Sequence, residues 1–315
     1  RPVTFLTSRA LQQRFEGHGG WANGDAAYLG TNPAPGAVIT YFRQKRHVFG
    51  RMRLDVLDAS GKLVDSLPAG KRPGMNRVAW SMHVDPPRVP TAAVRSSSSL
   101  SSPRVVPGRY RIRLIEGDQV YETTLDVVLD RRAGFTVADR KEQYDAAMRA
   151  HALFGTMSTL VDRLNGIRAL AEERGKQIGP GEPLAARLRT LEDKVEALRK
   201  QVVATKEGGA ITGEERLREH LDYAYHSLLS DEGKPSPYQV ERVATLAREL
   251  EEVRTGSDSL VKSDLGPLNE ELQKRGLKPI TLAMAEEEGA RWAALEELRG
   301  RDRRAAAATS TREHD

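Results

Sequence analysis

The chain has 315 residues, of which 39% are hydrophobic and 30% charged, and it contains no cysteine. This composition favours a protein of two domains with hydrophobic cores, and the lack of cysteine excludes disulfide bonds, cysteine zinc sites and thiol catalysis. The net charge of +5 is unevenly spread, because residues 1–137 carry 20 Lys and Arg against 11 Asp and Glu, whereas residues 138–315 carry 29 against 33.

The basic half has two interpretations. Its charge can attract an anionic surface such as a polysaccharide, a nucleic acid or membrane headgroups. The simpler interpretation is a solvated sheet face rich in arginine, and it is favoured because aromatic side chains are not interleaved with the basic ones as a nucleic-acid platform requires. We expect no nucleic-acid partner and, since no apolar run has the length of a membrane span, no membrane insertion.

Residues 1–34 are expected to form a lead-in to the first domain. Val3–Leu6 is apolar enough for a short strand, and the glycines from Gly17 onward are spaced like a dinucleotide-binding turn. That turn must stand between a strand and a helix, but Asn23-Gly24-Asp25 follows and indicates a further turn. We therefore interpret this stretch as a linker and not as a nucleotide site.

A β domain is predicted over residues 35–134. A loop with two prolines leads into the apolar run Val38–Phe42, which we expect to be its first strand. Apolar and polar residues then alternate through several short segments separated by turns, which favours an antiparallel β-sandwich of immunoglobulin (Ig) type. The serine-rich run Pro86–Pro107 is predicted to be a flexible surface loop between two of the strands.

Seven residues of the β domain are expected to have structural roles. Trp80 shares a face with Val78, which is typical of a core residue, although an indole can also stack on a ligand. The prolines and glycines stand where the chain enters a strand. The seven residues are Pro35, Gly36, Tyr41, Trp80, Pro107, Gly108 and Tyr110.

The hydrophobic period changes from strand to helix at Thr136, and residues 136–280 are predicted to form an antiparallel up-and-down helical bundle. Capping patterns predict helix starts at Thr136-x-x-Asp139, Thr212-x-x-Glu215 and Ser236-Pro237-x-Gln239. Another helix begins near Pro183. Together these patterns make the whole chain an α+β protein.

Glycine and proline residues that interrupt helices mark the end of the helical region. Gly266-Pro267 should break or kink the last helix, and Gly276 should end it. Residues 281–315 are charged and rich in alanine, and they are predicted to be a tail that is partly disordered, with a loose helix at its start.

The second helix carries a heptad seam, with apolar residues at four-three spacing from Leu184 to Val202. Such a seam can join two chains in a coiled coil. Packing within the chain is the favoured interpretation, because the neighbouring helices also need a partner for their apolar stripes.

No catalytic residue and no cofactor is expected. Glu219, Asp222 and His226 share one helical face and are weak candidates for metal ligands, but the facing helices place leucine and valine at the inward positions. Ser259-x-x-Lys262 has the S-x-x-K pattern of some serine enzymes without its companion motifs. A solvated polar face explains both groups more simply.

Four short motifs follow one another in the β region, at Asn32–Tyr41, Leu54–Val64, Gly74–Trp80 and Val106–Tyr110. In this order they resemble the C-terminal region of large bacterial sortilin-like proteins with BNR repeats, which are sialidase-like and often labelled glycosyl hydrolases. Pro235–Tyr238 and Asp264–Ile280 are similar to the end of the helical region in that family, so that the resemblance covers residues 3–280.

The resemblance implies that the Ig-like module and the helical bundle follow a secreted β-propeller. The Asp-box repeats of the propeller, S-x-D-x-G-x-x-W, do not occur in this sequence. We therefore expect an excerpt of a longer secreted or periplasmic bacterial protein, with a signal peptide and the propeller upstream of Arg1.

Three functions remain open at this point. The favoured one is a non-catalytic accessory region that supports a propeller in binding protein or glycan. The second is an accessory module of a sialidase-like glycoside hydrolase whose active site lies upstream. The third is an oligomeric scaffold joined by the coiled-coil seam.

Overall fold

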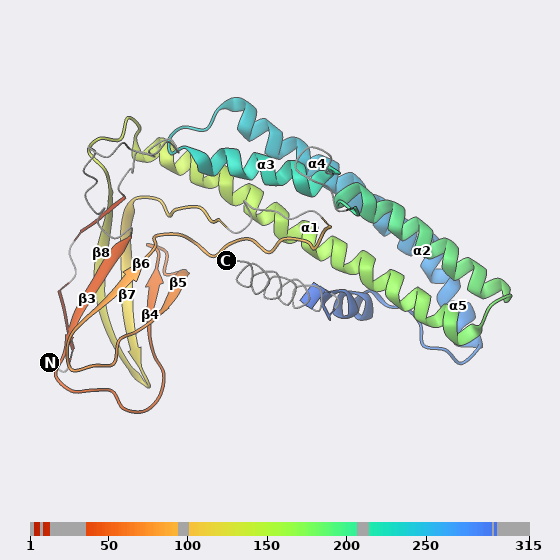
Figure 1. Ribbon diagram of the computed structural model, residues 1–315, viewed down its shortest axis with the longest axis horizontal. Coiled ribbons are helices and arrows are strands. Elements are labelled where there is room, and N and C mark those ends of the chain that lie inside the picture. Colours follow the sequence, from red (N-terminus) through yellow and green to blue (C-terminus); the bar gives the residue numbers. More distant parts are fainter. Residues whose placement is uncertain are drawn as a thin grey trace, which may run out of the picture. The chain divides into compact units, whose positions relative to one another are not determined.

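The computed structural model describes residues 3–6, 9–12, 36–93, 101–206, 214–291 and 293–294 (Figure 1). The predicted α+β class is confirmed, with strands in the first part of the chain and helices in the second. The chain forms two compact units. The first comprises Arg1–Pro86, Ser102–Asp145 and Asp231–Pro235, and the second comprises Pro87–Ser101, Ala146–Ser230 and Ser236–Asp315.

The strands of the first unit form two sheets with a shared hydrophobic core. The strands are β1 (Val3–Phe5), β2 (Ala10–Gln12), β3 (Ala37–Arg43), β4 (Met52–Leu57), β5 (Leu63–Pro68), β6 (Gly74–Trp80), β7 (Gly108–Glu116) and β8 (Gln119–Leu129). Their order is β1-β3-β6 in one sheet and β2-β8-β7-β4-β5 in the other. All pairs are antiparallel except β2 with β8. Side chains from both sheets, such as Ile39 and Leu114, belong to one core.

The strand Val38–Phe42 lies within β3 and is not the first strand, which corrects the sequence-based prediction. β1 precedes it and pairs with it antiparallel, with Thr4 opposite Phe42. The Leu6 amide continues the pairing by donating to the Thr40 carbonyl at 2.8 Å. A strand between two others must satisfy hydrogen-bonding groups on both edges, so part of the predicted lead-in belongs to the sheet. Pro35 and the glycine-rich turn that begins at Gly17 lie outside the described residues.

Gly36 is required where the chain enters β3. Its φ is +111°, and a Cβ at this position would lie 2.3 Å from the Trp80 carbonyl oxygen. Any side chain here would therefore force β3 away from β6 at the point where Ala37 pairs with Trp80.

The helices begin and end close to the predicted positions. They are α1 (Val137–Ile178), α2 (Pro183–Val202), α3 (Leu217–Ser230), α4 (Pro237–Leu260) and α5 (Gly266–Lys274), with a π-helix at Val261–Leu265 between the last two. The π-helix and α5 stand where Gly266-Pro267 predicts a break. None of the described helices is both long and apolar enough to span a membrane.

Two predicted caps are confirmed and one predicted start is wrong. Thr136 and Asp139 exchange hydrogen bonds at the start of α1, and Ser236 and Gln239 form a capping box at α4. α3 begins at Leu217 and not in the turn after Thr212, a residue outside the described ranges. The neighbouring Glu214 carboxylate accepts from the Thr205 amide at 2.7 Å, and this bond, together with one from the Arg216 guanidinium, lowers the pKa of Glu214 to about 2.

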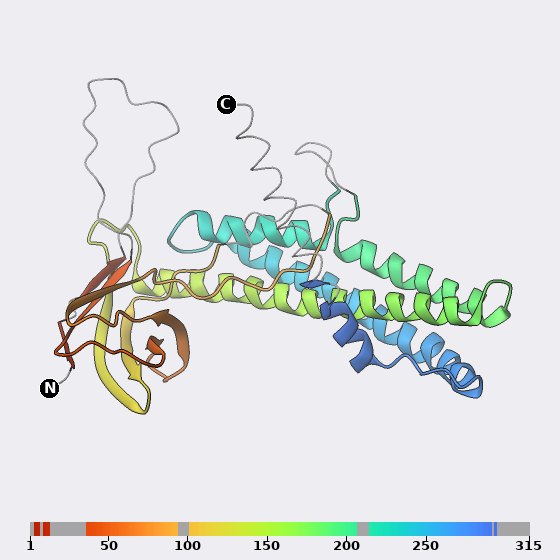
Figure 2. The same ribbon diagram turned by 60° about the horizontal axis from the view of Figure 1, so that its bottom comes forward.

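The heptad seam of α2 is buried inside the second unit. Figures 1 and 2 show α2 alongside the C-terminal half of α1 and α3 alongside a more N-terminal part. The core of this unit takes side chains from α1 to α5. The seam residues in it are Leu184, Leu188, Leu191, Val195 and Val202, each at most 2% exposed. The seam therefore has its partners within the chain.

The predicted flexible loop Pro86–Pro107 is anchored on both sides of residues 94–100, which lie outside the described ranges. The Ser158 hydroxyl donates to the Arg88 carbonyl at 2.9 Å, and the Arg88 guanidinium pairs with Asp162. Ala93 bonds to Ala204, and the Tyr225 hydroxyl donates to the Ser101 carbonyl at 3.1 Å. Polar anchors of this kind hold the segment against the helices, which serine-rich composition cannot reveal.

Residues 282–291 form the helix that was expected at the start of the tail, but this helix is packed and not loose (Figure 2). Ala285 is fully buried in the core of the second unit. A Cβ on Gly166 of α1 would lie 1.7 Å from the Ala285 carbonyl oxygen, and a Cβ on Gly289 would lie 1.8 Å from the Asp162 carbonyl oxygen. The two backbones approach this closely because each contributes a glycine at the crossing.

The close contact between α1 and residues 282–291 predicts that substitutions at two glycines of α1 change stability in opposite directions. Gly166→Ala should lower the free energy of unfolding of the second unit by about 1–3 kcal/mol, because the new methyl group meets backbone. Gly155→Ala is the control, since a Cβ there has no atom within 4 Å. It should raise stability by about 0.5–1 kcal/mol through helix propensity. Urea unfolding followed by circular dichroism measures both, and equal effects would contradict the docking of residues 282–291.

Candidate functional site

The weak metal candidates do not form a metal site. Glu219 is buried, pairs with Arg218 at 2.7 Å and accepts from the Arg216 amide at 3.0 Å, so that it caps the start of α3. Asp222 is partly buried and His226 is exposed. Within the described ranges no group of three or more His, Cys, Asp or Glu residues is placed to hold a metal ion.

The predicted structural residues Trp80 and Tyr110 meet in the core of the first unit. The ring centroids lie 5.2 Å apart in an edge arrangement, and Trp80 is fully buried. The Tyr110 hydroxyl donates to the Val106 carbonyl at 2.6 Å, immediately before Pro107 and Gly108 at the entry to β7. Trp80 therefore fills the core and is inaccessible to a stacking ligand.

A buried ion network fixes one end of the first unit. Arg43, at the end of β3, makes two bonds to the Glu116 carboxylate, at 2.8 and 3.0 Å. His47 Nδ1 lies 2.7 Å from the same carboxylate. The bond from Arg43, reinforced by His47, lowers the pKa of Glu116 despite its partial burial. This network holds the chain that follows β3 against the end of β7.

Two loops meet at this end of the unit, residues 44–51 and 69–73. The His47 amide donates to the Lys71 carbonyl at 3.0 Å, Lys71 Nζ donates to the Gly50 carbonyl at 2.7 Å, and the Tyr41 hydroxyl donates to the Gly70 carbonyl at 2.7 Å. We call the exposed surface of these loops the basic tip. It consists of Lys45, Arg46, Val48, Phe49, Arg51, Lys71 and Arg72.

A second exposed surface covers the outer side of the three-stranded sheet. Phe42 of β3 lies opposite Met75 of β6, and Val38 lies opposite Ala79. We call the exposed apolar group Leu6, Val38, Phe42 and Met75 the sheet face. These side chains are 40–54% exposed, although alternation along β3 would normally place polar residues here.

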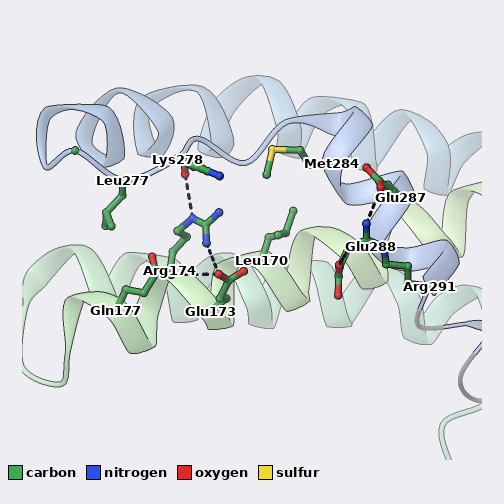
Figure 3. Close-up of a pocket in the computed structure, with 11 residues that line it drawn as sticks. Leu170, Glu173, Arg174, Gln177, Leu277, Lys278, Met284, Glu287, Glu288 and Arg291 are labelled. Atoms are coloured by element: carbon green, nitrogen blue, oxygen red, sulfur yellow. Dashed lines mark hydrogen bonds and ion pairs between the residues drawn. The ribbon is translucent and has the colours of Figure 1, made fainter.

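A groove of about 460 Å³ lies in the second unit, between α1 and the segment that leads into residues 282–291 (Figure 3). Leu170, Leu277 and Met284 line it together with charged side chains. The charges are paired internally: Arg174 bonds to Glu173 and to the Lys278 carbonyl, and Arg291 pairs with Glu287. The groove thus offers little unpaired charge to a ligand.

Sequence reasoning missed both exposed surfaces of the first unit. Phe49 does stand among basic residues, in the run Lys45-Arg46-His47-Val48-Phe49-Gly50-Arg51, contrary to the expectation that aromatic and basic side chains are not interleaved. The apolar pair Val48 and Phe49, flanked by basic residues in this run, was the sequence signal that could have revealed the first of these loops. The partner loop with Lys71 and Arg72 is distant in sequence, and only the fold brings it alongside.

No protein-family model matches the chain, and no curated protein matches it. A search of solved structures finds a likeness to the crystal structure of CopC from Methylosinus trichosporium OB3b, with 14% sequence identity. The aligned part covers 31% of this chain and 80% of that chain, with a TM-score of 0.19. A likeness at this score carries no argument about the present chain.

Proposed function

We propose that this chain is a non-catalytic support region of a secreted, sortilin-like BNR-repeat protein, and that its first unit packs against the β-propeller of the same polypeptide. In this proposal the first unit is an Ig-like β-sandwich and the second an up-and-down helical bundle. The propeller binds the protein or glycan ligand, and the present chain holds the propeller in place.

Topology supports the Ig-like assignment. A sheet of three strands and a sheet of five share one core, and most neighbours are antiparallel. Tyr110 lies near the start of β7, and its hydroxyl bonds back to the carbonyl of Val106. A tyrosine that bonds to the backbone just upstream is a recurrent feature of Ig-like sandwiches.

The support function is carried by the sheet face. Four apolar side chains at 40–54% exposure on one side of a sheet are unfavourable in water and favourable against another protein surface. β1 is an edge strand of this sheet and the first of the described strands, so a domain joined ahead of it would emerge beside the sheet face. The preceding propeller is therefore the proposed occupant.

The proposal predicts that one charge on the sheet face weakens the interaction strongly. Met75→Glu should weaken binding between the present chain and the separately produced upstream region at least about tenfold, because a carboxylate would be buried against apolar surface. Isothermal titration calorimetry measures this affinity.

Leu63→Glu provides a matched control on the other sheet. Met75 and Leu63 are both 53% exposed, but Leu63 lies on β5, at an edge of the five-stranded sheet. This variant should bind like the unmodified chain. Equal affinity of both variants, or an upstream sequence without Asp-box repeats, would contradict the proposed function.

A further inference from the structure

We propose that the basic tip is a docking site for the surface of a membrane that contains anionic phospholipids. Val48 and Phe49 would enter the headgroup boundary, and the five cations around them would contact lipid phosphates. This site is separate from the sheet face, and its occupant is a bilayer surface and not a protein domain.

The apolar part of the basic tip is unusually exposed. Phe49 is 85% exposed and Val48 is 65% exposed, and no other large apolar side chain in the described part of the first unit is as exposed as either. Isolated exposed apolar residues need no explanation, but these two are adjacent and stand at the end of a loop. Side chains so placed can enter a lipid interface without any change in the fold.

Some cations on the sheets are neutralised by carboxylates, although within the described residues Arg77 and Arg111 have no ion-pair partner. On the β7–β8 hairpin, Arg109 pairs with Asp126 and Arg113 pairs with Glu122. Within the described part of the chain, none of the five tip cations has a carboxylate partner in an ion pair; they are Lys45, Arg46, Arg51, Lys71 and Arg72. Unpaired cations that surround an apolar pair match an anionic headgroup layer above hydrocarbon.

The basic tip is held in position before any ligand binds. Arg43, Glu116 and His47 fix the base of the first loop, and Lys71 Nζ joins the second loop to the Gly50 carbonyl. Because these contacts already order both loops, docking would not incur the full entropic cost of ordering them.

The exposed apolar pair Val48 and Phe49 favours lipid over an acidic polysaccharide as the ligand of the basic tip. A polysaccharide would contact the cations through sulfate or carboxylate groups, and valine offers it neither a hydrogen bond nor a flat ring. A bilayer takes up both Val48 and Phe49. The two ligands therefore differ in whether binding depends on the apolar pair.

The test measures sedimentation of the full chain with phosphatidylcholine vesicles, with and without phosphatidylserine. We expect binding to the anionic vesicles, weakened by salt, and little binding to the neutral ones. Lys45→Glu/Arg46→Glu should reduce partitioning about 30-fold or more, since each cation near an anionic surface contributes about a fivefold factor. Phe49→Ser should reduce it about tenfold while it leaves the charge unchanged.

Lys62→Glu/Arg111→Glu is the matched control, because it changes the net charge equally at the opposite end of the same sheet. It should retain binding close to that of the unmodified chain. Absence of binding to anionic vesicles, or equal loss in both charge variants, would overturn the proposal. So would tight binding to heparin that Phe49→Ser leaves unchanged, combined with no vesicle binding, since the site would then recognise a polysaccharide.

Discussion

Trp80→Ala is expected to lower the free energy of unfolding of the first unit by about 3–5 kcal/mol. Trp80 is fully buried, belongs to the core shared by the two sheets and packs edge-on against Tyr110. Its removal leaves a large cavity where β6 faces β7, because neighbours in a close-packed core can move only partly into the space. Urea unfolding monitored by circular dichroism gives the value.

Phe49→Ala is the control for this substitution. It also removes an aromatic ring from the first unit, but Phe49 is 85% exposed and should contribute less than about 0.5 kcal/mol. The two variants together separate the loss of core packing from the loss of an aromatic residue. A cost below about 1 kcal/mol for Trp80→Ala would mean that the indole is not part of the core.

Local patterns in the sequence predicted local structure well. The capping residues Thr136, Asp139, Ser236 and Gln239 act where the pattern places them, because a cap depends on residues only three positions apart. Alternation predicted strands, and the four-three spacing of α2 predicted a buried seam, because each depends on a period within one element. The α+β class follows from these local signals.

Features that depend on distant residues were missed. Glycine usually destabilises a helix, but Gly166 and Gly289 permit two helix backbones to cross closely. Thr212 and Glu215 have capping spacing in the sequence, but α3 begins at Leu217, where Glu219 accepts from the Arg216 amide. The basic tip likewise joins loops that meet only after folding, so no single stretch of sequence displays it.

The same contacts serve stability and the proposed membrane site. Arg43 ends the central strand of the three-stranded sheet, and Glu116 ends β7 in the other sheet, so their bond joins the two sheets beneath the basic tip. Weakening this bond should therefore both destabilise the first unit and loosen the loop that carries Phe49.

Glu116→Ala is expected to lower the free energy of unfolding by on the order of 3 kcal/mol, because it leaves the Arg43 guanidinium buried without its carboxylate. The Arg43 side chain is 6% exposed and that of Glu116 is 18% exposed. Glu122→Ala is the matched control on the same hairpin. Its pair with Arg113 has side chains 46% and 36% exposed, and such pairs contribute at most about 1 kcal/mol.

The dependence of this loss on pH distinguishes the ion network from simple packing. The pKa of Glu116 is lowered in the folded protein from its ordinary value of 4.5, chiefly by the bond from Arg43. In the pH range between the two pKa values the unfolded chain binds more protons than the folded one, so the stabilisation is complete above pH 4.5 and is lost as pH falls through the folded pKa. The stability difference between the unmodified chain and Glu116→Gln should therefore shrink as the pH falls below 4.5. If Glu116→Gln had the stability of the unmodified chain at every pH, the Glu116 side chain would contribute by shape alone, and the basic tip would then lack the ionic anchor that positions Phe49.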